Sequence, residues 1–485
     1  MPERADIVFR RANIYDGSGA APFRGDVAVQ GDRIIGVFSR EDSVAVSGEQ
    51  EIDASHLALA PGFIDAHTHD DRIVIDDPDM VPKISQGVTS VVVGNCGISL
   101  APVTFDDDPP PPMNLLGGRE AYAFPTFASY AHRLRQQPPA VNVAALIGHS
   151  ALRLRAMNDI RRKATASEIA RMQDLADEAV AHGATGFSTG LFYPTNAAAD
   201  REEVAAVAQR FARRGGVYAT HMRDEFDRIL DSIDETLVTA ADADIPVVVS
   251  HHKCAGPENW GRTTETLGVL EAAAQKQRVN LDVYPYTAGS TNLRADLVTA
   301  DYPIRITWST PHPEMTGREL SAIAKDWNCS LDEAARRLDP AGAIYFQMDE
   351  EDVRRVMGSG LAMIGSDGLP HDRHPHPRLW GTFPRVIGHY ARDVGLFSIA
   401  QAIHKMTGLT AKVFGLADRG HIRAGAFADL VLFDPAAIRD RATYDAPRLR
   451  CEGIEMVFVN GRLAFEPHAG VLAHAGRLIG GHSRN

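Results

Sequence analysis

The sequence predicts an α/β protein: a (β/α)8 barrel of the TIM type, with a small β-sandwich domain built from both termini and an inserted lid. Three observations lead to this prediction. Apolar strand-like runs alternate with helical stretches through the middle of the chain, both ends are rich in short β-like runs, and metal-binding residue types follow several central runs. A doubly wound open sheet is the competing fold, but it would not gather residues from nearly all the strands around one point.

The two chain ends have the same texture. Short β-rich runs occur near the N-terminus at residues 6–9, 26–29 and 33–38, and near the C-terminus at residues 428–433, 455–459 and 462–465. Gly31-Asp32 and Asn460-Gly461 are tight-turn signals between neighbouring runs. We therefore expect one small domain from residues 1–58 and 415–485; two unrelated terminal flaps are the alternative.

The middle of the chain predicts the barrel, at residues 59–414. The apolar runs that predict its strands end near His67, Cys96, His149, Gly190, His221, His251, Tyr284 and Asp367. Helical patterns lie between them, as in residues 167–182, where apolar residues share a face and Thr165 and Glu168 form a capping-box pair. Eight strands that alternate with helices imply parallel βα units and, most economically, a closed barrel.

Two segments interrupt this rhythm. Residues 105–113 hold three aspartates and four prolines, which predicts a loop. Residues 289–346 make the gap before the last strand about twice the usual length and include a predicted helix at 330–338. On the loop face of a barrel, such an insertion is expected to act as a lid, with a passive packing insertion as the alternative.

Composition limits the classes of partner. Of the 485 residues, 44% are hydrophobic and 23% charged, as is usual for a globular protein, and the net charge of −13 argues against nucleic acid or an anionic membrane as a partner. The sequence has no apolar run long enough to span a membrane and no signal-peptide core at its start. Its four cysteines form neither a CxxC pair nor a disulfide framework. We expect a cytoplasmic enzyme acting on a small molecule; the oligomeric state is not indicated, and a monomer is compatible with the sequence.

Several of the predicted strand ends carry residues that bind metals. They are His67 and His69 after the first strand, Cys96 after the second, His221 and His251 after the fifth and sixth, and Asp367 after the eighth. The carboxyl ends of barrel strands share one mouth, so these side chains should meet there. A lone histidine of this kind is more often a buried polar residue with its hydrogen bonds satisfied. Six such residues at five strand ends predict a site for zinc or a similar metal.

Longer motifs surround these residues. They are Ala-Pro-Gly-Phe-Ile-Asp-Ala-His-Thr-His-Asp-Asp (60–71), Gly-Asn-Cys-Gly-Ile-Ser-Leu-Ala-Pro (94–102), Thr-His-Met-Arg-Asp-Glu (220–225), Ser-His-His-Lys (250–253), Tyr-Pro-Tyr (284–286), Gly-Ser-Asp-Gly-Leu-Pro (365–370), Arg-Leu-Trp-Gly-Thr-Phe (378–383) and Ala-Asp-Leu-Val (428–431). Over nearly its whole length the chain resembles the N-acyl-D-amino-acid deacylases, or D-aminoacylases, of the amidohydrolase superfamily. Cysteine at the second strand together with Ser-His-His-Lys is the most specific part of the resemblance.

The resemblance implies a set of metal ligands. Cys96, His221 and His251 would hold a tightly bound zinc ion, and His67, His69 and Asp367 would form an adjacent, weaker metal site. Many superfamily members bridge two metals with a carboxylated lysine, but the matching stretch Gly-Phe-Ser-Thr-Gly (186–190) has no lysine. Cys96, as a soft thiolate ligand, would take over that anchoring role. We prefer one catalytic zinc, with a second metal left open.

The resemblance also implies the reaction and the substrate contacts. Zinc-bound hydroxide would attack the amide carbonyl of an N-acyl-D-amino acid, with Asp367 as general base and then general acid. Lys253, Tyr284 and Arg378 would hold the α-carboxylate, and Ser290 would contribute to substrate binding. Arg294 either neutralises an acidic substrate side chain or lies on the surface. The preference for D over L substrates comes from the resemblance alone.

Two other functions remain open. One is another amidohydrolase reaction, such as hydrolysis of a cyclic amide (a hydantoin or dihydropyrimidine), although those relatives generally use the lysine that is missing here. The other is a non-catalytic zinc-binding barrel. A structural zinc usually fills all four positions with protein ligands, whereas this set includes an extra carboxylate and nearby cations.

Overall fold

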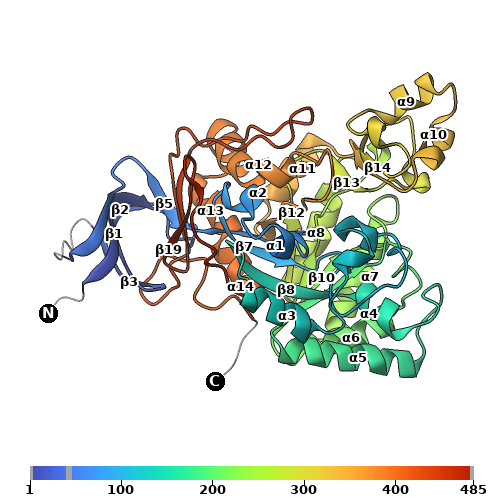
Figure 1. The fold of residues 1–485 in the computed structure, drawn as a ribbon, viewed down its shortest axis with the longest axis horizontal. Coiled ribbons are helices and arrows are strands. Elements are labelled where there is room, and N and C mark those ends of the chain that lie inside the picture. The colour runs from blue at the N-terminus through green and yellow to red at the C-terminus, as the bar shows by residue number, and fades with distance from the viewer. Residues whose placement is uncertain (1–3, 40–45, 481–485) are drawn as a thin grey trace.

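The computed structural model describes residues 4–39 and 46–480. Eight parallel strands follow one another around a barrel, in the order β6, β7, β8, β9, β10, β11, β12 and β16 (Figure 1). They are β6 (Phe63–Asp65), β7 (Val88–Val93), β8 (Asn142–Gly148), β9 (Gly186–Gly190), β10 (Val217–His221), β11 (Val247–Val249), β12 (Val279–Val283) and β16 (Ala362–Ile364). The predicted fold class is confirmed, and each strand lies in a predicted apolar run.

The barrel closes at a seam between its first and last strands. The amide of Ala66 donates to the carbonyl of Ile364 at 3.1 Å, and the amide of Asp367 donates to the carbonyl of His67 at 2.8 Å. Inside the barrel, apolar side chains such as Ile64, Val92 and Met363 form a buried core. The structure has a packed interior, so a ligand can approach only at the strand ends.

Helices follow most of the barrel strands. They are α1 (Ile73–Asp76), α2 (Val81–Ile84), α3 (Phe127–Gln136), α4 (His149–Ala156), α5 (Ala166–Ala181), α6 (Arg201–Ala212), α7 (Ile229–Asp242), α8 (Thr263–Ala274), α11 (Glu350–Gly358), α12 (Arg378–Arg385), α13 (Ile399–Met406) and α14 (Gly408–Val413). The predicted capping box is present at the start of α5, where Thr165 and Glu168 bond each other's backbone amides. No helix in residues 4–39 and 46–480 has the length and apolar character needed to cross a bilayer.

Strands from both chain ends form a single sheet, on the left of Figure 1. Its members are β1 (Ala5–Ile14), β2 (Phe23–Gln30), β3 (Arg33–Ser39), β4 (Gly48–Asp53), β5 (Ala58–Pro61), β17 (Leu430–Phe433), β18 (Ile454–Val459), β19 (Arg462–Glu466) and β20 (Gly470–Val471). The two ends meet where β5 pairs antiparallel with β17. Gly62 alone separates β5 from barrel strand β6, so this sheet leads directly into the strand before His67. The domain boundaries proposed from the sequence stay a prediction.

The insertion before the last barrel strand is a separate small unit, at the upper right of Figure 1. It contains β13 (Gly289–Asn292), β14 (Ile304–Ser309) and β15 (Ala341–Tyr345) as a three-stranded sheet, with α9 (Leu320–Asp326) and α10 (Leu331–Leu338). Ile306, Leu320 and Leu338 contribute to a hydrophobic core of its own. The helix predicted at 330–338 is α10, and its role as a lid stays a prediction.

Candidate metal centre

The six residues with metal-binding side chains come together at one end of the barrel. They follow β6 (His67 and His69), β7 (Cys96), β11 (His251) and β16 (Asp367), or end β10 (His221). All six are buried; Asp367, the most exposed, has 7% of its surface accessible. The structure therefore brings together residues that lie up to 300 positions apart in the sequence.

Three of these residues have an unusual backbone conformation. Cys96, His251 and Asp367 have φ values of +54°, +36° and +50°, in the left-handed region that residues other than glycine rarely adopt. Each comes just after its barrel strand. Such strain commonly occurs at functional sites, because the surrounding structure must hold it in place.

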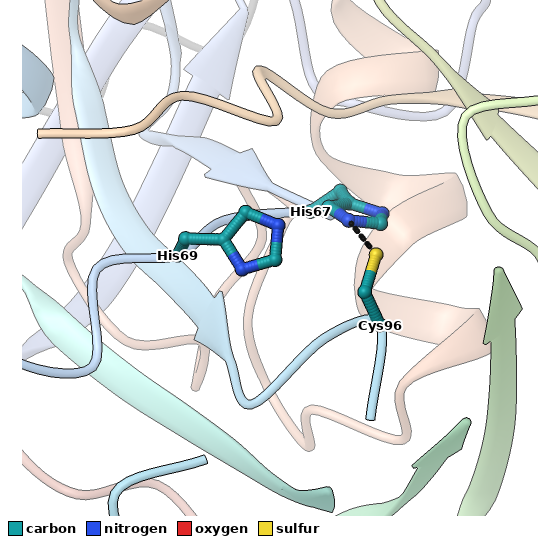
Figure 2. A group of neighbouring side chains, drawn as sticks. All are labelled: His67, His69 and Cys96. Atoms are coloured by element: carbon teal, nitrogen blue, oxygen red, sulfur yellow. Dashed lines mark hydrogen bonds between the residues drawn. The ribbon is translucent and has the colours of Figure 1, made fainter. Parts of the chain in front are cut away.

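Their ligand atoms form overlapping groups. Within each of three sets the atoms lie within 4.8 Å of one another: His67, His69 and Cys96; Cys96, His221 and His251; His67, His251 and Asp367. The Sγ of Cys96 lies 3.2 Å from Nε2 of His67 and 3.4 Å from Nε2 of His251. Figure 2 shows Cys96 and His67 pointing toward each other, with His69 beside them. Because the sets share members, the cluster can hold one metal or two neighbouring metals.

The donor set fits zinc. Both ring nitrogens of His221, and Nδ1 of His69, are buried without a hydrogen bond of normal geometry among the described residues. Burial raises the pKa of the Cys96 thiol, but the adjacent His67 and His251 outweigh it and hold that pKa well below its usual value. A thiolate with free imidazole nitrogens is a typical zinc donor set.

Asp367 is held as a carboxylate beside this cluster. Its Oδ1 lies 3.2 Å from Nε2 of His69 and 3.5 Å from Nε2 of His67, and its Oδ2 lies 2.9 Å from Nη1 of Arg378. Burial raises the pKa of Asp367, but the charges of Arg378 and His67 outweigh burial and keep it well below the usual range. At neutral pH this group is therefore ionised and able to accept a proton.

Two carboxylates that the sequence analysis did not identify, Asp282 and Glu225, contact His67 and His251. Asp282, on β12, lies 3.2 Å from Nδ1 of His67 and accepts the backbone N–H of His251 at 2.8 Å. Glu225 lies 3.0 Å from Nδ1 of His251. A carboxylate on Nδ1 directs Nε2 toward a metal. Two sequence features could have pointed to them. Glu225 is the last residue of the Thr-His-Met-Arg-Asp-Glu motif, and Asp282 lies in an apolar run two positions before Tyr284.

Replacing Glu225 with glutamine is expected to weaken zinc binding by about 10- to 100-fold, because His251 loses the carboxylate that orients its ring. Competition with a chromophoric chelator measures this affinity. Glu203→Gln is the matched control, since Glu203 is a buried carboxylate 3.0 Å from Nε2 of His149, outside the cluster. The control should lower the melting temperature and leave zinc affinity unchanged. Equal zinc affinity in wild type and Glu225→Gln would contradict the orienting role.

Cationic and aromatic side chains lie next to the cluster. The Nζ of Lys253 is 2.7 Å from Glu225 and donates to the carbonyl of His251 at 3.1 Å. Arg378 is fully buried, lies 4.5 Å above the ring of Tyr284 and donates to the carbonyl of Ser290 at 3.2 Å. The structure thus places Lys253, Tyr284, Ser290 and Arg378 close to Asp367, and their role in substrate binding stays a prediction.

Arg294 occupies a different position. Its guanidinium lies 4.0 Å above the ring of Phe192, and Asp296 binds it at 2.6 and 3.0 Å. Phe192 in turn stacks on His221 with 5.0 Å between ring centroids. Arg294 therefore supports the wall of the site from behind, and its charge is already paired.

A small cavity joins these groups. Its wall includes His69, Cys96, His221, His251, Lys253, Tyr284 and Asp367 together with apolar residues, and the insertion contributes Gly289, Ser290, Thr291, Leu297 and Tyr345. The cavity is small, with a volume of about 40 Å³. The insertion is the part of its wall that has a hydrophobic core of its own.

Comparison with known proteins agrees with this arrangement. Residues 50–465 match the model of the amidohydrolase family. D-aminoacylase from Alcaligenes xylosoxydans xylosoxydans is 51% identical over 98% of this chain and 97% of its own length.

Two solved structures give the same result. A D-aminoacylase structure, described in terms of a binuclear metal centre with one-metal activation and second-metal attenuation, has a TM-score of 0.95 at 50% identity, covering 98% of this chain and 100% of that one. The N-acyl-D-glutamate deacylase of Bordetella bronchiseptica was solved with zinc and a phosphonate that mimics the tetrahedral intermediate. It has a TM-score of 0.93 at 44% identity, with 98% and 100% of the two chains covered.

Proposed function

The chain belongs to the amidohydrolase family, and we propose that it hydrolyses the amide bond of N-acyl-D-amino acids in a metal-dependent reaction, releasing a carboxylate and the free D-amino acid. The observation that carries this proposal is the cluster of Cys96, His221 and His251 facing Asp367, with Lys253 and Arg378 beside it. Relatives of known activity, matched over nearly the whole chain, support the same reaction. The D configuration is inferred from those relatives.

In this proposal Cys96, His221 and His251 hold one zinc ion tightly, and His67, His69 and Asp367 are available to a second, weaker one. Zinc at this position polarises an amide carbonyl and makes water more acidic. Asp367 takes a proton from the attacking water as the new carbon–oxygen bond forms. It then delivers that proton to the amide nitrogen as the carbon–nitrogen bond breaks, which releases the amino acid with its amine restored.

The substrate carboxylate requires cations, and the site supplies them. Arg378 lies against the ring of Tyr284 and Lys253 lines the cavity, and both cations are buried, with 0% and 5% of their surface exposed. Each is held by one carboxylate of the protein, Asp367 and Glu225 respectively. A buried cation with a single acid partner retains hydrogen-bond donors for a substrate carboxylate.

Replacing Arg378 with glutamine is expected to raise KM about 100-fold with a smaller change in kcat, because a charge-assisted hydrogen bond to the substrate carboxylate is lost. Steady-state kinetics with an N-acetyl-D-amino acid measure the split. Arg385→Gln is the control: Arg385 ends the same helix and pairs with Asp440 at 3.2 Å. An unchanged KM in Arg378→Gln would exclude Arg378 from carboxylate binding.

We further propose that the preferred substrate has an apolar side chain. Leu115, Phe192, Phe226, Leu297 and Leu369 form an apolar part of the cavity wall. Arg294, which stacks on Phe192, has all three guanidinium nitrogens engaged, two by the carboxylate of Asp296 and one by the carbonyl of Phe192. An acidic side chain would therefore be desolvated there without a free cation, which is unfavourable.

The decisive experiment combines metal analysis with a substrate panel. Purified protein is loaded with zinc, and amine release is measured from N-acetyl-D-leucine, N-acetyl-D-aspartate, N-acetyl-D-glutamate and their L counterparts, with a hydantoin and dihydrouracil alongside. We expect release from the D substrates, fastest with leucine. Activity on the cyclic amides alone would favour the other amidohydrolase reaction, and inactivity of zinc-loaded protein on every compound would favour a binding barrel.

A further inference from the structure

A second cluster of buried polar groups lies at the barrel seam, next to the metal-binding residues. It consists of Asp65 at the end of β6, Asp70 just after His69, Lys83 on α2 and Ser366 just before Asp367. All four are almost completely inaccessible, with 0% of the surface exposed for Asp65, Asp70 and Ser366 and 1% for Lys83. None of these four described residues forms part of the cavity wall.

Lys83 is the centre of this cluster. Its Nζ donates to Oδ2 of Asp65 at 2.8 Å and to Oγ of Ser366 at 2.5 Å, and it lies 3.4 Å from Oδ2 of Asp70. Two of its three donor protons therefore have hydrogen-bond partners, and the carboxylate of Asp70 lies at ion-pair distance from the same ammonium group. One side chain therefore ties the segment that carries His67 and His69 to the segment that carries Asp367.

Asp65 extends this connection to the backbone. Its second oxygen, Oδ1, accepts the amide of Ser366 at 2.7 Å and the amide of His67 at 3.3 Å. The two segments are also in close contact, because a Cβ added to Gly365 would lie 2.5 Å from Cβ of His67. Lys83 thus fixes the carboxylate of Asp65, which in turn accepts hydrogen bonds from the backbone amides of His67 and Ser366.

The seam needs such a connection more than the other strand pairs do. β9 and β10 pair along five consecutive residues, whereas β6 and β16 are joined by the two backbone hydrogen bonds described above. These two bonds flank His67, and Asp367 itself donates one of them. The distance between Asp367 and the two histidines therefore depends on side chains that cross the seam.

We propose that Lys83, acting through Asp65 and Ser366, is a positioning residue that holds Asp367 in place relative to His67 and His69. The kinetic consequence rests on the proposed function, whereas the structural consequence does not. A displacement of about 1 Å at a reacting group can lower a rate by about 100-fold. The tight zinc ligands Cys96, His221 and His251 lie on other strands and should keep their geometry.

The test compares two buried lysines that bond to opposite ends of the same strand. Lys83→Met removes the connection at the seam. Lys405→Met is the matched control, because Lys405 is 7% exposed and its Nζ donates to the carbonyls of Ser359 and Ala362, at the start of β16. We expect kcat to fall about 100-fold in Lys83→Met with KM and tightly bound zinc retained. In Lys405→Met we expect a lower melting temperature and a kcat within about threefold of wild type.

Amide hydrogen exchange gives a readout that does not depend on activity. In Lys83→Met, exchange should accelerate in residues 63–70 and 362–368, and in Lys405→Met it should not accelerate in residues 63–70. If Lys83→Met does not fold, Ser366→Ala decides instead, since it removes one uncharged contact and should still lower kcat by about tenfold. If Lys83→Met or Ser366→Ala folds and has the kcat and the seam hydrogen exchange of the wild type, the positioning role of Lys83 is wrong. Wild-type protein inactive on the whole panel, with faster seam exchange in Lys83→Met, would overturn the proposed function alone.

Discussion

Replacing Asp367 with asparagine is expected to lower kcat by about a thousandfold or more, while tightly bound zinc stays near one equivalent per chain. Positioned proton transfer typically contributes 10²- to 10⁴-fold, and here one carboxylate serves both proton-transfer steps. Asparagine keeps the size and one acceptor oxygen, but it cannot take the proton of the attacking water. Arg378 would lose its charged partner at 2.9 Å and remain free to bind substrate, so KM should change little.

The matched control for this prediction is Asp372→Asn. Asp372 lies in the same loop, is 3% exposed and is absent from the three metal-binding groups found among the described residues. Burial raises the pKa of Asp372 to about 7, so a neutral amide is a small change there, and kcat should stay within about threefold of wild type. Joint loss of zinc and activity in Asp367→Asn would make Asp367 a metal ligand without a separate proton-transfer role. Unchanged turnover would exclude it from the chemistry.

The second large effect is expected at Cys96. Cys96→Ala should abolish tight zinc binding and reduce amide hydrolysis to the background rate, because two imidazoles remain where the thiolate and two imidazoles were. Zinc is measured by atomic absorption after gel filtration, and activity is measured with and without added zinc. Removing zinc from the wild type with a chelator should give the same loss, reversed by adding zinc back.

Cys254→Ala is the control for Cys96→Ala. Cys254 is equally buried, but burial raises the pKa of its thiol to about 12, and it belongs to none of the metal-binding groups among residues 4–39 and 46–480. Zinc content and rate should remain at the wild-type level in this variant. Full zinc occupancy in Cys96→Ala would show that His67, His69 and Asp367 provide the principal site.

The sequence predicted the barrel and the metal cluster because both depend on short-range patterns. A strand-length apolar run that ends at His221 or His251 predicts both the barrel strand and the metal-binding residue at its carboxyl end. The capping box at Thr165 and Glu168 and the turn at Asn460-Gly461 are equally local. For the same reason the β-rich character of both chain ends could be predicted from short local runs, whereas the strand order of their sheet could not.

What the sequence could not predict depends on contacts between distant segments. Asp282 orients His67 across 215 positions, and Lys83 reaches Ser366 across 283. The left-handed backbone of Cys96 carries no signal in its residue type, since glycine is the usual residue there. The sequence left two alternatives for Arg294, a partner for an acidic substrate side chain or a surface residue. The structure shows that it pairs with Asp296 and stacks on Phe192.

The pairing of β5 with β17 bears on how the protein matures as it is synthesised. β5 is followed after one residue by β6, and the amide of Gly62, the linking residue, donates to the carbonyl of Asp429 at 2.8 Å. The strand that delivers His67 and His69 is therefore anchored by a segment that leaves the ribosome near the end of translation. Until then β5, the strand that leads into β6, lacks its antiparallel partner.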